Sequence, residues 1–390
     1  MNFDEIIERR GTHSAKWDGM QASYGVSPDD GIPMWVADMD FRPPQVVQAA
    51  LERMLDNGVY GYFGGEGGYK AAIQWWMKTR HGWDLDPTHV FTTHGLVNGT
   101  GLCVQAFTEP GDGVVLFTPV YHAFARVIRS SGRKVVECPL VENDGRMVMD
   151  LDAYDAQMTG NEKMLILCSP HNPGGQVWSV EELRAVADFA VRHELVLVSD
   201  EIHHDLVMPG HSHTVMPLAA PEVADRLVML TAGTKTFNIA GAHVGNVTIA
   251  NPILREKFAA VMAGLGISAN SFGLEMITAA YSPEGAAWVD ALVAYLDGNR
   301  QIMERGLAEI PGVKLIPLQA TYLVWVDFKD TGMDAGEIKA RVQKDARIAA
   351  NHGESFGAGG EAFLRFNVAT PRARIQEAVA RLQGAFADLQ

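Results

Sequence analysis

The sequence predicts an α/β fold, in which helices cover both faces of a mostly parallel sheet and a smaller α+β domain lies beside it. Between about residues 90 and 250, short apolar runs alternate with amphipathic stretches, as in a parallel sheet that is buried on both sides. The chain has 390 residues. A single hydrophobic core rarely serves more than about 250–300 residues. Two domains are therefore expected.

The predicted elements follow one another along the chain. Helices are expected at 45–57 and 69–80, with a glycine-rich loop at 61–68 between them. The strands expected in the large sheet are 113–118, 134–138, 164–168, 195–199, 227–231 and 244–249. Ser179 and Glu182 form the capping box of a helix between two of these strands.

The last third of the chain shows a different order of elements. A long helix is expected at 285–309. It is followed by strands near 313–317, 321–327 and 363–367 and by helices near 334–344 and 372–388, with Pro371 just inside the start of the last one. We therefore expect a large domain from residues 45–285 and a small α+β domain from residues 1–44 and 286–390.

Composition and charge narrow the class of function. The formal net charge of −15 argues against binding to nucleic acid or to an anionic membrane surface. No stretch approaches the roughly 18 uninterrupted apolar residues of a spanning helix, and the charged N-terminal residues do not resemble a signal peptide. The three cysteines form no C-x-x-C pair, so neither a disulfide framework nor a structural zinc site is expected. A cytoplasmic protein that acts on small molecules fits best.

Chemically useful side chains follow the predicted strands. Tyr121 follows the strand at 113–118, Asn172 the strand at 164–168, Asp200 the strand at 195–199, and Lys235 the strand at 227–231. Ligands of open α/β sheets bind at the carboxyl ends of the strands, where these side chains would meet. The sequence THGLV at 93–97 opens a helix, and its free backbone N–H groups suit an anion such as phosphate.

This set of groups suits pyridoxal phosphate. That cofactor needs a lysine amine for a Schiff base and a carboxylate beside its ring nitrogen. Each residue alone has a simpler explanation: Lys235 as a solvated charge, Asp200 as a helix cap, Tyr121 as a core residue and Asn172 as part of a turn. Their joint occurrence in strand order favours the cofactor.

The same residues resemble those of a known family. HNPGG at 171–175, SDEIHHDL at 199–206 and TKTFNIAGA at 234–242 resemble the cofactor motifs of the fold-type I, class I/II aminotransferase superfamily. WVADMDF at 35–41 and FLRFNVATPR at 363–372 resemble its cystathionine β-lyase branch, the MalY/PatB-type C–S lyases. The resemblance extends over essentially the whole chain. It implies the pyridoxal-phosphate fold type I, with a mostly parallel seven-stranded sheet in the large domain.

The resemblance also implies roles for individual residues. Lys235 matches the Schiff-base lysine and acid/base, Asp200 the partner of the ring nitrogen, and Tyr121 the residue stacked on the ring. Further residues that match cofactor contacts are Asn172, Gly95, Leu96, Val97, His203, Thr234 and Tyr62. Those that match substrate contacts are Arg365, which would bind the α-carboxylate, Ala37 and Asn172. In the family the tyrosine matched by Tyr62 reaches the neighbouring subunit, which implies a homodimer with shared active sites.

The sequence departs from the common aminotransferase pattern at three positions. His243 stands where many members have an arginine that pairs with the phosphate, Ala232 replaces a frequent serine, and His203 replaces a frequent tyrosine. The phosphate would then be held by amides and hydroxyls such as that of Thr234, with His243 as a further candidate. The lyase branch shares the loss of the arginine.

Two other classes of function are less well supported. A metal site could draw on Asp200, Glu201, His203, His204, Asp205, His211 and His213, but no H-E-x-x-H or similar register occurs, and no metal is expected. A binding protein without catalysis would not need both Lys235 and Arg365. We therefore expect a carbon–sulfur β-lyase that cleaves an L-cysteine-derived thioether to a thiol, pyruvate and ammonia. The alternative is an aminotransferase of class I/II.

Overall fold

The large sheet has seven strands and is mostly parallel, as predicted. The computed structural model describes residues 1–143 and 145–389. The strand order is β2-β10-β9-β8-β7-β3-β4. The bounds are β2 (Val90–Thr93), β3 (Gly113–Thr118), β4 (Lys134–Pro139), β7 (Glu162–Cys168), β8 (Val196–Asp200), β9 (Leu227–Thr231) and β10 (Gly245–Ile249). Only β10 runs antiparallel to its two neighbours. The sequence analysis did not identify β2, which is only four residues long.

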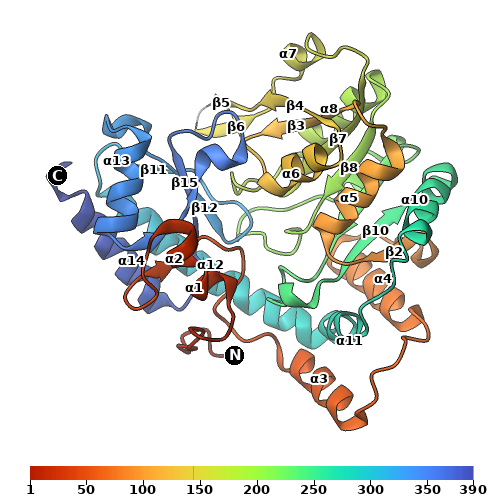
Figure 1. Ribbon diagram of the computed structural model, residues 1–390, viewed down its shortest axis with the longest axis horizontal. Coiled ribbons are helices and arrows are strands. Elements are labelled where there is room, and N and C mark those ends of the chain that lie inside the picture. The colour runs from red at the N-terminus through yellow and green to blue at the C-terminus, as the bar shows by residue number, and fades with distance from the viewer. Residues whose placement is uncertain (144, 390) are drawn as a thin grey trace.

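Helices cover both faces of this sheet (Figure 1). Along β3, Val114 and Leu116 belong to one hydrophobic cluster, whereas Val115 and Phe117 belong to the other. The first cluster includes residues of α5 (Leu96–Phe107), α6 (His122–Ser130) and α10 (Pro252–Gly264). The second includes residues of α4 (Gly67–His81), α8 (Val180–Arg192), α11 (Ser271–Ala280) and α12 (Pro283–Ala308). The alternation of side chains along each strand thus explains why its apolar run is continuous.

The predicted capping box of α8 is present. The Ser179 side chain accepts the backbone N–H of Glu182, and the Glu182 side chain accepts the backbone N–H of Ser179. Helix α3 (Gln45–Asn57) has the predicted bounds, and α4 extends beyond its prediction at both ends.

A small antiparallel sheet of order β11-β12-β15-β14 forms the second layer. Its strands are β11 (Lys314–Leu315), β12 (Leu323–Asp327), β14 (Asn351–His352) and β15 (Phe363–Asn367). The first two are shorter than predicted, and β14 was not predicted. The expected helix at 334–344 divides into α13 (Ala335–Ala340) and a π-helical turn at Arg341–Asp345.

The predicted position of Pro371 inside the last helix is wrong. Helix α14 begins at Arg372 and ends at Ala385, and Pro371 is its N-cap with a ψ of 141°. This extended backbone lies outside the helix, which starts only with the next residue. The bounds of the remaining elements are α1 (Ala15–Asp18), α2 (Met20–Tyr24), β1 (Ile32–Pro33), β5 (Val141–Asn143), β6 (Arg146–Val148), α7 (Leu151–Asp155), α9 (Met216–Ala219), β13 (Ile348–Ala349), and 3₁₀ turns at Pro87–His89, Pro221–Val223, Ala240–Ala242, Lys329–Thr331, Gly353–Phe356 and Ala387–Leu389.

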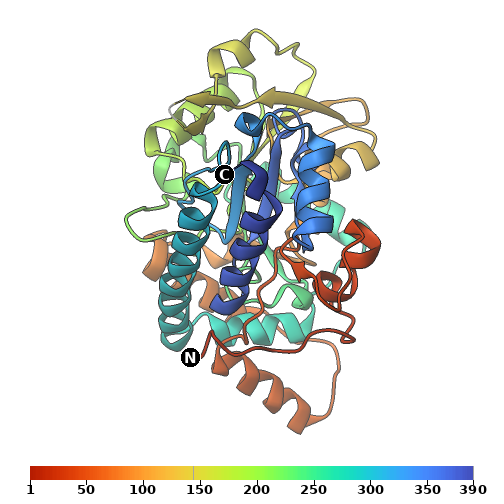
Figure 2. The same ribbon diagram turned by 90° about the vertical axis from the view of Figure 1, so that its left-hand side faces the viewer.

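The N-terminal segment packs against the C-terminal part of the chain. Strand β1 pairs in parallel with β13, and the red N-terminal helices lie beside the blue C-terminal elements in both views (Figures 1 and 2). The large sheet draws on residues 90–249 and the small one on residues 314–367. The exact domain boundaries stay a prediction. Within the described residues, no helix combines the length and apolarity needed to cross a bilayer.

Candidate active site

A cavity of 550 Å³ opens at the carboxyl ends of β7 and β8, beside the start of α5. All the predicted site residues except Tyr62 and Arg365 line it: Ala37, Gly95, Leu96, Val97, Tyr121, Asn172, Asp200, His203, Thr234 and Lys235. The shared edge of the parallel strands brings Tyr121, Asn172, Asp200 and Lys235 together, as the sequence predicted.

Lys235 lies on the wall of this cavity, in the turn that follows β9. Its Nζ atom donates a hydrogen bond to the carbonyl of Ala37 at 2.7 Å. Burial of the amine lowers the pKa of Lys235 to about 8, although the carboxylates of Asp38 and Asp200 act in the opposite direction. The neutral form of the amine, which is the nucleophile and proton acceptor, is thus accessible near neutral pH.

Asp200 ends β8 and is 5% exposed. Its Oδ1 atom accepts the backbone N–H of Ile202 at 3.1 Å, and no lysine or arginine of the described chain forms an ion pair with it. Burial raises the pKa of Asp200 to about 7. The carboxylate of the neighbouring Glu201 is already occupied, since it accepts hydrogen bonds from Ser199, His213 and the backbone N–H of Met216. Of these two neighbouring carboxylates, Asp200 is the one available to a cationic N–H group in the cavity.

The start of α5 offers backbone donors to the same cavity. Gly95 is the N-cap with a φ of +82°, a conformation that favours glycine. The first N–H groups of a helix have no partner within it, so those of Leu96 and Val97 are available to an anion. Gly245 of β10 lies against this turn, and a Cβ atom there would come within 2.6 Å of Leu96 Cδ2. Close packing of strand against helix start thus fixes the position of the donors.

His203 and Tyr121 present aromatic groups to the cavity. Burial lowers the pKa of His203 well below its ordinary value, so its ring is neutral. Its buried Nδ1 atom has no hydrogen-bond partner among the described residues. Tyr121 is the N-cap of α6, and its ring meets Phe124 edge to face at 5.5 Å. Both side chains are therefore held by packing while retaining polar atoms for a ligand.

The segment at residues 35–39 is held by side chains from distant parts of the chain. Asn367 Nδ2 donates to the carbonyls of Val36 at 2.7 Å and Asp38 at 2.5 Å. Asn238 Nδ2 donates to the carbonyl of Met39, and its Oδ1 accepts the N–H of the same residue. These two asparagines were not identified from the sequence, although both lie within the quoted motifs. They place Ala37 against Lys235.

Arg365 lies behind the cavity wall rather than on it. Its Nη1 atom donates to Asn172 Oδ1 at 2.9 Å, and its Nη2 atom donates to the carbonyl of Trp35 at 2.9 Å and to Asn351 Oδ1. The guanidinium lies over the Phe356 ring, 4.9 Å from its centroid. Burial lowers the pKa of Arg365 to about 10, and Nε has no partner among the described residues. Arg365 therefore reaches the cavity through Asn172.

Tyr62 lies outside the cavity. It is fully exposed in the loop between α3 and α4, where it lines a separate hollow with Tyr60 and Phe63. A single chain does not bring Tyr62 to Lys235, so its contact with a cofactor stays a prediction. The sequence analysis also assigned no role to His94, Asn98 and Arg126, which line the cavity.

The sequence of the chain matches that of a known protein family. Residues 31–382 match the family model "Aminotransferase class I and II". The chain therefore belongs to the class I and II aminotransferase family.

Three proteins similar to this chain match it over almost its whole length. The chain is 39% identical to cystathionine beta-lyase PatB of Bacillus subtilis over 99% of its own length and 100% of the relative. It is 31% identical to protein MalY of Escherichia coli, covering 98% of this chain and 97% of that one. Its structure is similar to that of cystalysin from Treponema denticola, which contains a pyridoxal 5'-phosphate cofactor, with a TM-score of 0.95, 37% identity and coverage of 100% and 99%.

Proposed function

We propose that this protein is a pyridoxal-phosphate-dependent carbon–sulfur β-lyase, which cleaves an L-cysteine-derived thioether to a thiol, pyruvate and ammonia. The observation that carries the proposal is that the Lys235 amine and the Asp200 carboxylate, which forms no ion pair with a described lysine or arginine, line one 550 Å³ cavity. The names of relatives support the choice of reaction, since PatB is called a cystathionine beta-lyase and another similar structure is a C–S lyase from Staphylococcus hominis, with 30% identity, a TM-score of 0.88 and coverage of 99% and 98%.

The donors and acceptors of the cavity fit the cofactor. Asp200 is a buried acceptor that pairs with no cationic side chain of residues 1–143 and 145–389, which suits a protonated ring nitrogen. The N–H groups at the start of α5 suit a phosphate, and the buried Nδ1 of His203 has no hydrogen-bond partner in the described part of the chain. When bound, pyridoxal phosphate supplies an electron sink for negative charge at the substrate Cα.

The residues of the chain would then divide the remaining tasks. Lys235 would hold the cofactor through its amine and, once released, take the proton from the substrate Cα. Asp200 would keep the proton on the ring nitrogen, and Tyr121 would stack on the ring. Thr234 and the amides of Gly95, Leu96 and Val97 would bind the phosphate.

A second group of residues would orient the substrate. Arg365 and Asn172 would bind the α-carboxylate, because a guanidinium supplies paired N–H donors that match two carboxylate oxygens. Ala37 would flank the substrate amine, because the carbonyl of Ala37 already accepts a hydrogen bond from the Lys235 amine. With the substrate fixed in this way, loss of the Cα proton can be followed by departure of a thiolate from Cβ.

Product analysis tests the reaction. The holoenzyme, given L-cystathionine alone, should release homocysteine, pyruvate and ammonia in equal amounts. Addition of a 2-oxo acid should leave the rate unchanged. Turnover that requires a 2-oxo acid and yields no free ammonia would instead assign an aminotransferase, as the broader family allows.

We further propose a cytoplasmic homodimer with shared active sites. Cys103, Cys138 and Cys168 are free thiols, which fits a reducing compartment. Exposure of the three aromatic residues Tyr60, Tyr62 and Phe63 on one loop fits a surface that a second copy covers. Light scattering of the purified holoenzyme tests the assembly.

A further inference from the structure

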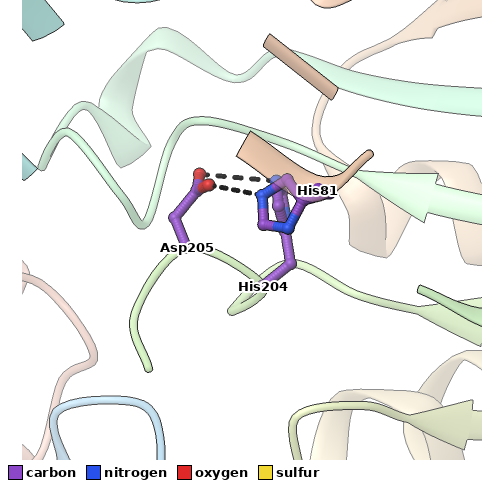
Figure 3. Close-up of side chains that lie close together, drawn as sticks. All are labelled: His81, His204 and Asp205. Atoms are coloured by element: carbon purple, nitrogen blue, oxygen red, sulfur yellow. Dashed lines mark hydrogen bonds and ion pairs between the residues drawn. The ribbon is translucent and has the colours of Figure 1, made fainter. Parts of the chain in front are cut away.

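A second cluster of polar side chains lies apart from the cavity. It consists of His81, at the end of α4, and of His204 and Asp205, in the turns after β8. Their side chains point toward one another (Figure 3). His81 Nε2 lies 2.8 Å from Asp205 Oδ1, and His204 Nε2 lies 3.3 Å from Asp205 Oδ2. Residues from distant parts of the sequence thus form one compact group of nitrogen and oxygen atoms.

The orientation of His204 makes this arrangement unusual. The residue is 1% exposed, and its Nδ1 atom is hydrogen-bonded to the backbone carbonyl of Glu201. A carbonyl only accepts, so Nδ1 carries the proton of a neutral ring and Nε2 carries the lone pair. Nε2 makes no hydrogen bond with any described residue, yet it lies beside the carboxylate of Asp205. A lone pair that faces a carboxylate calls for a cation between them.

The spacing fits a small metal ion. Ligands at 2.0–2.1 Å from a tetrahedral zinc ion are separated by about 3.4 Å. The ligand atoms of His81, His204 and Asp205 all lie within 4.8 Å of one another. The His204–Asp205 separation of 3.3 Å is close to the tetrahedral separation, whereas His81 and Asp205 are joined by a hydrogen bond of 2.8 Å and would have to move apart slightly. Small side-chain shifts would therefore be enough to place one ion between all three.

The surroundings also fit a metal site. Trp76 Nε1 donates to Asp205 Oδ1 at 3.0 Å and Thr236 Oγ1 donates to Oδ2 at 2.8 Å, so the carboxylate is held by outer hydrogen bonds. A hollow of 350 Å³ borders the cluster and can supply a water molecule as a further ligand. His211 and His213 line the same hollow.

We infer that His81, His204 and Asp205 bind one divalent transition-metal ion of the zinc class, with one position open to water from the adjoining hollow. Two imidazoles and one carboxylate favour such ions over magnesium or calcium, which prefer oxygen ligands. Because Asp205 also binds Thr236, next to Lys235, the ion would brace α4 against the lysine turn. The inference does not depend on the proposed reaction.

Metal titration tests the inference directly. The holoenzyme, treated with a chelator and dialysed, is titrated with zinc chloride in a calorimeter and with cobalt chloride while visible absorption is recorded beyond the cofactor band. We expect one ion per chain, a higher melting temperature with zinc, and tighter binding as the pH rises, since the ligands must be unprotonated. Magnesium chloride should give neither heat nor stabilisation.

Variants locate the ion. His204→Ala and His81→Ala should each weaken zinc binding by more than about 100-fold, because even outer-shell changes cost 10–100-fold. His81 lies at the edge of the hollow, so its variant serves if His204→Ala does not fold. His89→Ala is the matched control: His89 Nε2 also lies near a carboxylate, 3.7 Å from Asp86, and its loss should leave binding unchanged. No stoichiometric binding by the wild type, or binding that survives in the variants, would overturn the inference.

Discussion

Arg365→Lys separates the binding of the substrate carboxylate from the folding of the site. Arginine has five N–H donors, and three bonds of Arg365 go to Asn172, Trp35 and Asn351. The Nε–H and one Nη1–H have no acceptor in these bonds, and the Nη1 group, which already contacts Asn172 at the cavity wall, is the one that can reach a carboxylate there. Lysine keeps the charge but cannot fill the buried acceptors and also present paired donors.

The expected loss follows from these bonds. Charge-assisted hydrogen bonds contribute roughly 1.5–3 kcal/mol, so kcat/KM should fall by about one to two orders of magnitude. KM should account for most of the change if the carboxylate is bound equally in the ground and transition states. The buried acceptors left without a donor should also lower the free energy of unfolding.

The assay needs a control for that second effect. Pyruvate release from L-cystathionine gives kcat and KM, and urea denaturation gives the stability of the same preparation. Arg374→Lys is a matched control, because Arg374 also lies over an aromatic ring, 4.4 Å from the centroid of Trp17, and lies 3.6 Å from Asp40. It should lose stability while keeping kcat/KM. An Arg365→Lys enzyme with nearly unchanged kcat/KM, or a control with an equal loss, would refute the assigned role.

The remaining predictions concern four other positions. Lys235→Ala should abolish pyruvate release, and borohydride should no longer fix the cofactor to the chain, as mass spectrometry can show. In the cofactor-free protein, burial raises the pKa of Asp200 from 3.8 to about 7, so thermal stability should fall as the pH rises between these values, and Asp200→Asn should flatten that part of the profile. Hybrids of Tyr62→Ala and Lys235→Ala subunits should recover activity that neither parent has, in proportion to the hybrid fraction. Lys16→Met should lower the free energy of unfolding in urea by about 3 kcal/mol, because fully buried Lys16 pairs with buried Asp40 at 2.9 Å.

Each of these predictions has a result that contradicts it. Wild-type turnover in Lys235→Ala would contradict the catalytic role of Lys235. An unaltered pH profile of thermal stability in Asp200→Asn would show that another group titrates between pH 3.8 and about 7. Inactive hybrids would argue against shared sites. Lys78→Met is the control for Lys16→Met: the ion pair of Lys78 with Asp84 is exposed, so this change should leave the free energy of unfolding nearly unaltered. Equal losses in the two variants would contradict the importance of the buried pair.

Much of the site could be predicted because parallel strands end at one edge of a sheet. Asn172, Asp200 and Lys235 follow apolar strands, so their convergence follows from chain order and the α/β pattern alone. The antiparallel direction of β10 could not be predicted in this way, because a buried strand has the same apolar sequence in either direction. The short strand β2 was missed for a related reason: four residues carry too little periodicity.

Local patterns in the sequence were enough to predict the layers, the carboxyl-edge location of the cavity and most of the residues that line it. These features depend on side-chain periodicity and on the residue that follows each strand, both of which are local. The three-dimensional packing of the chain was needed to show that Arg365 reaches the cavity through Asn172. It was also needed to show that Asn238 and Asn367 hold the segment beside Lys235, and that His81 meets His204 and Asp205. Such contacts join residues far apart in the chain, and they form only when the helices and the two sheets have packed in three dimensions.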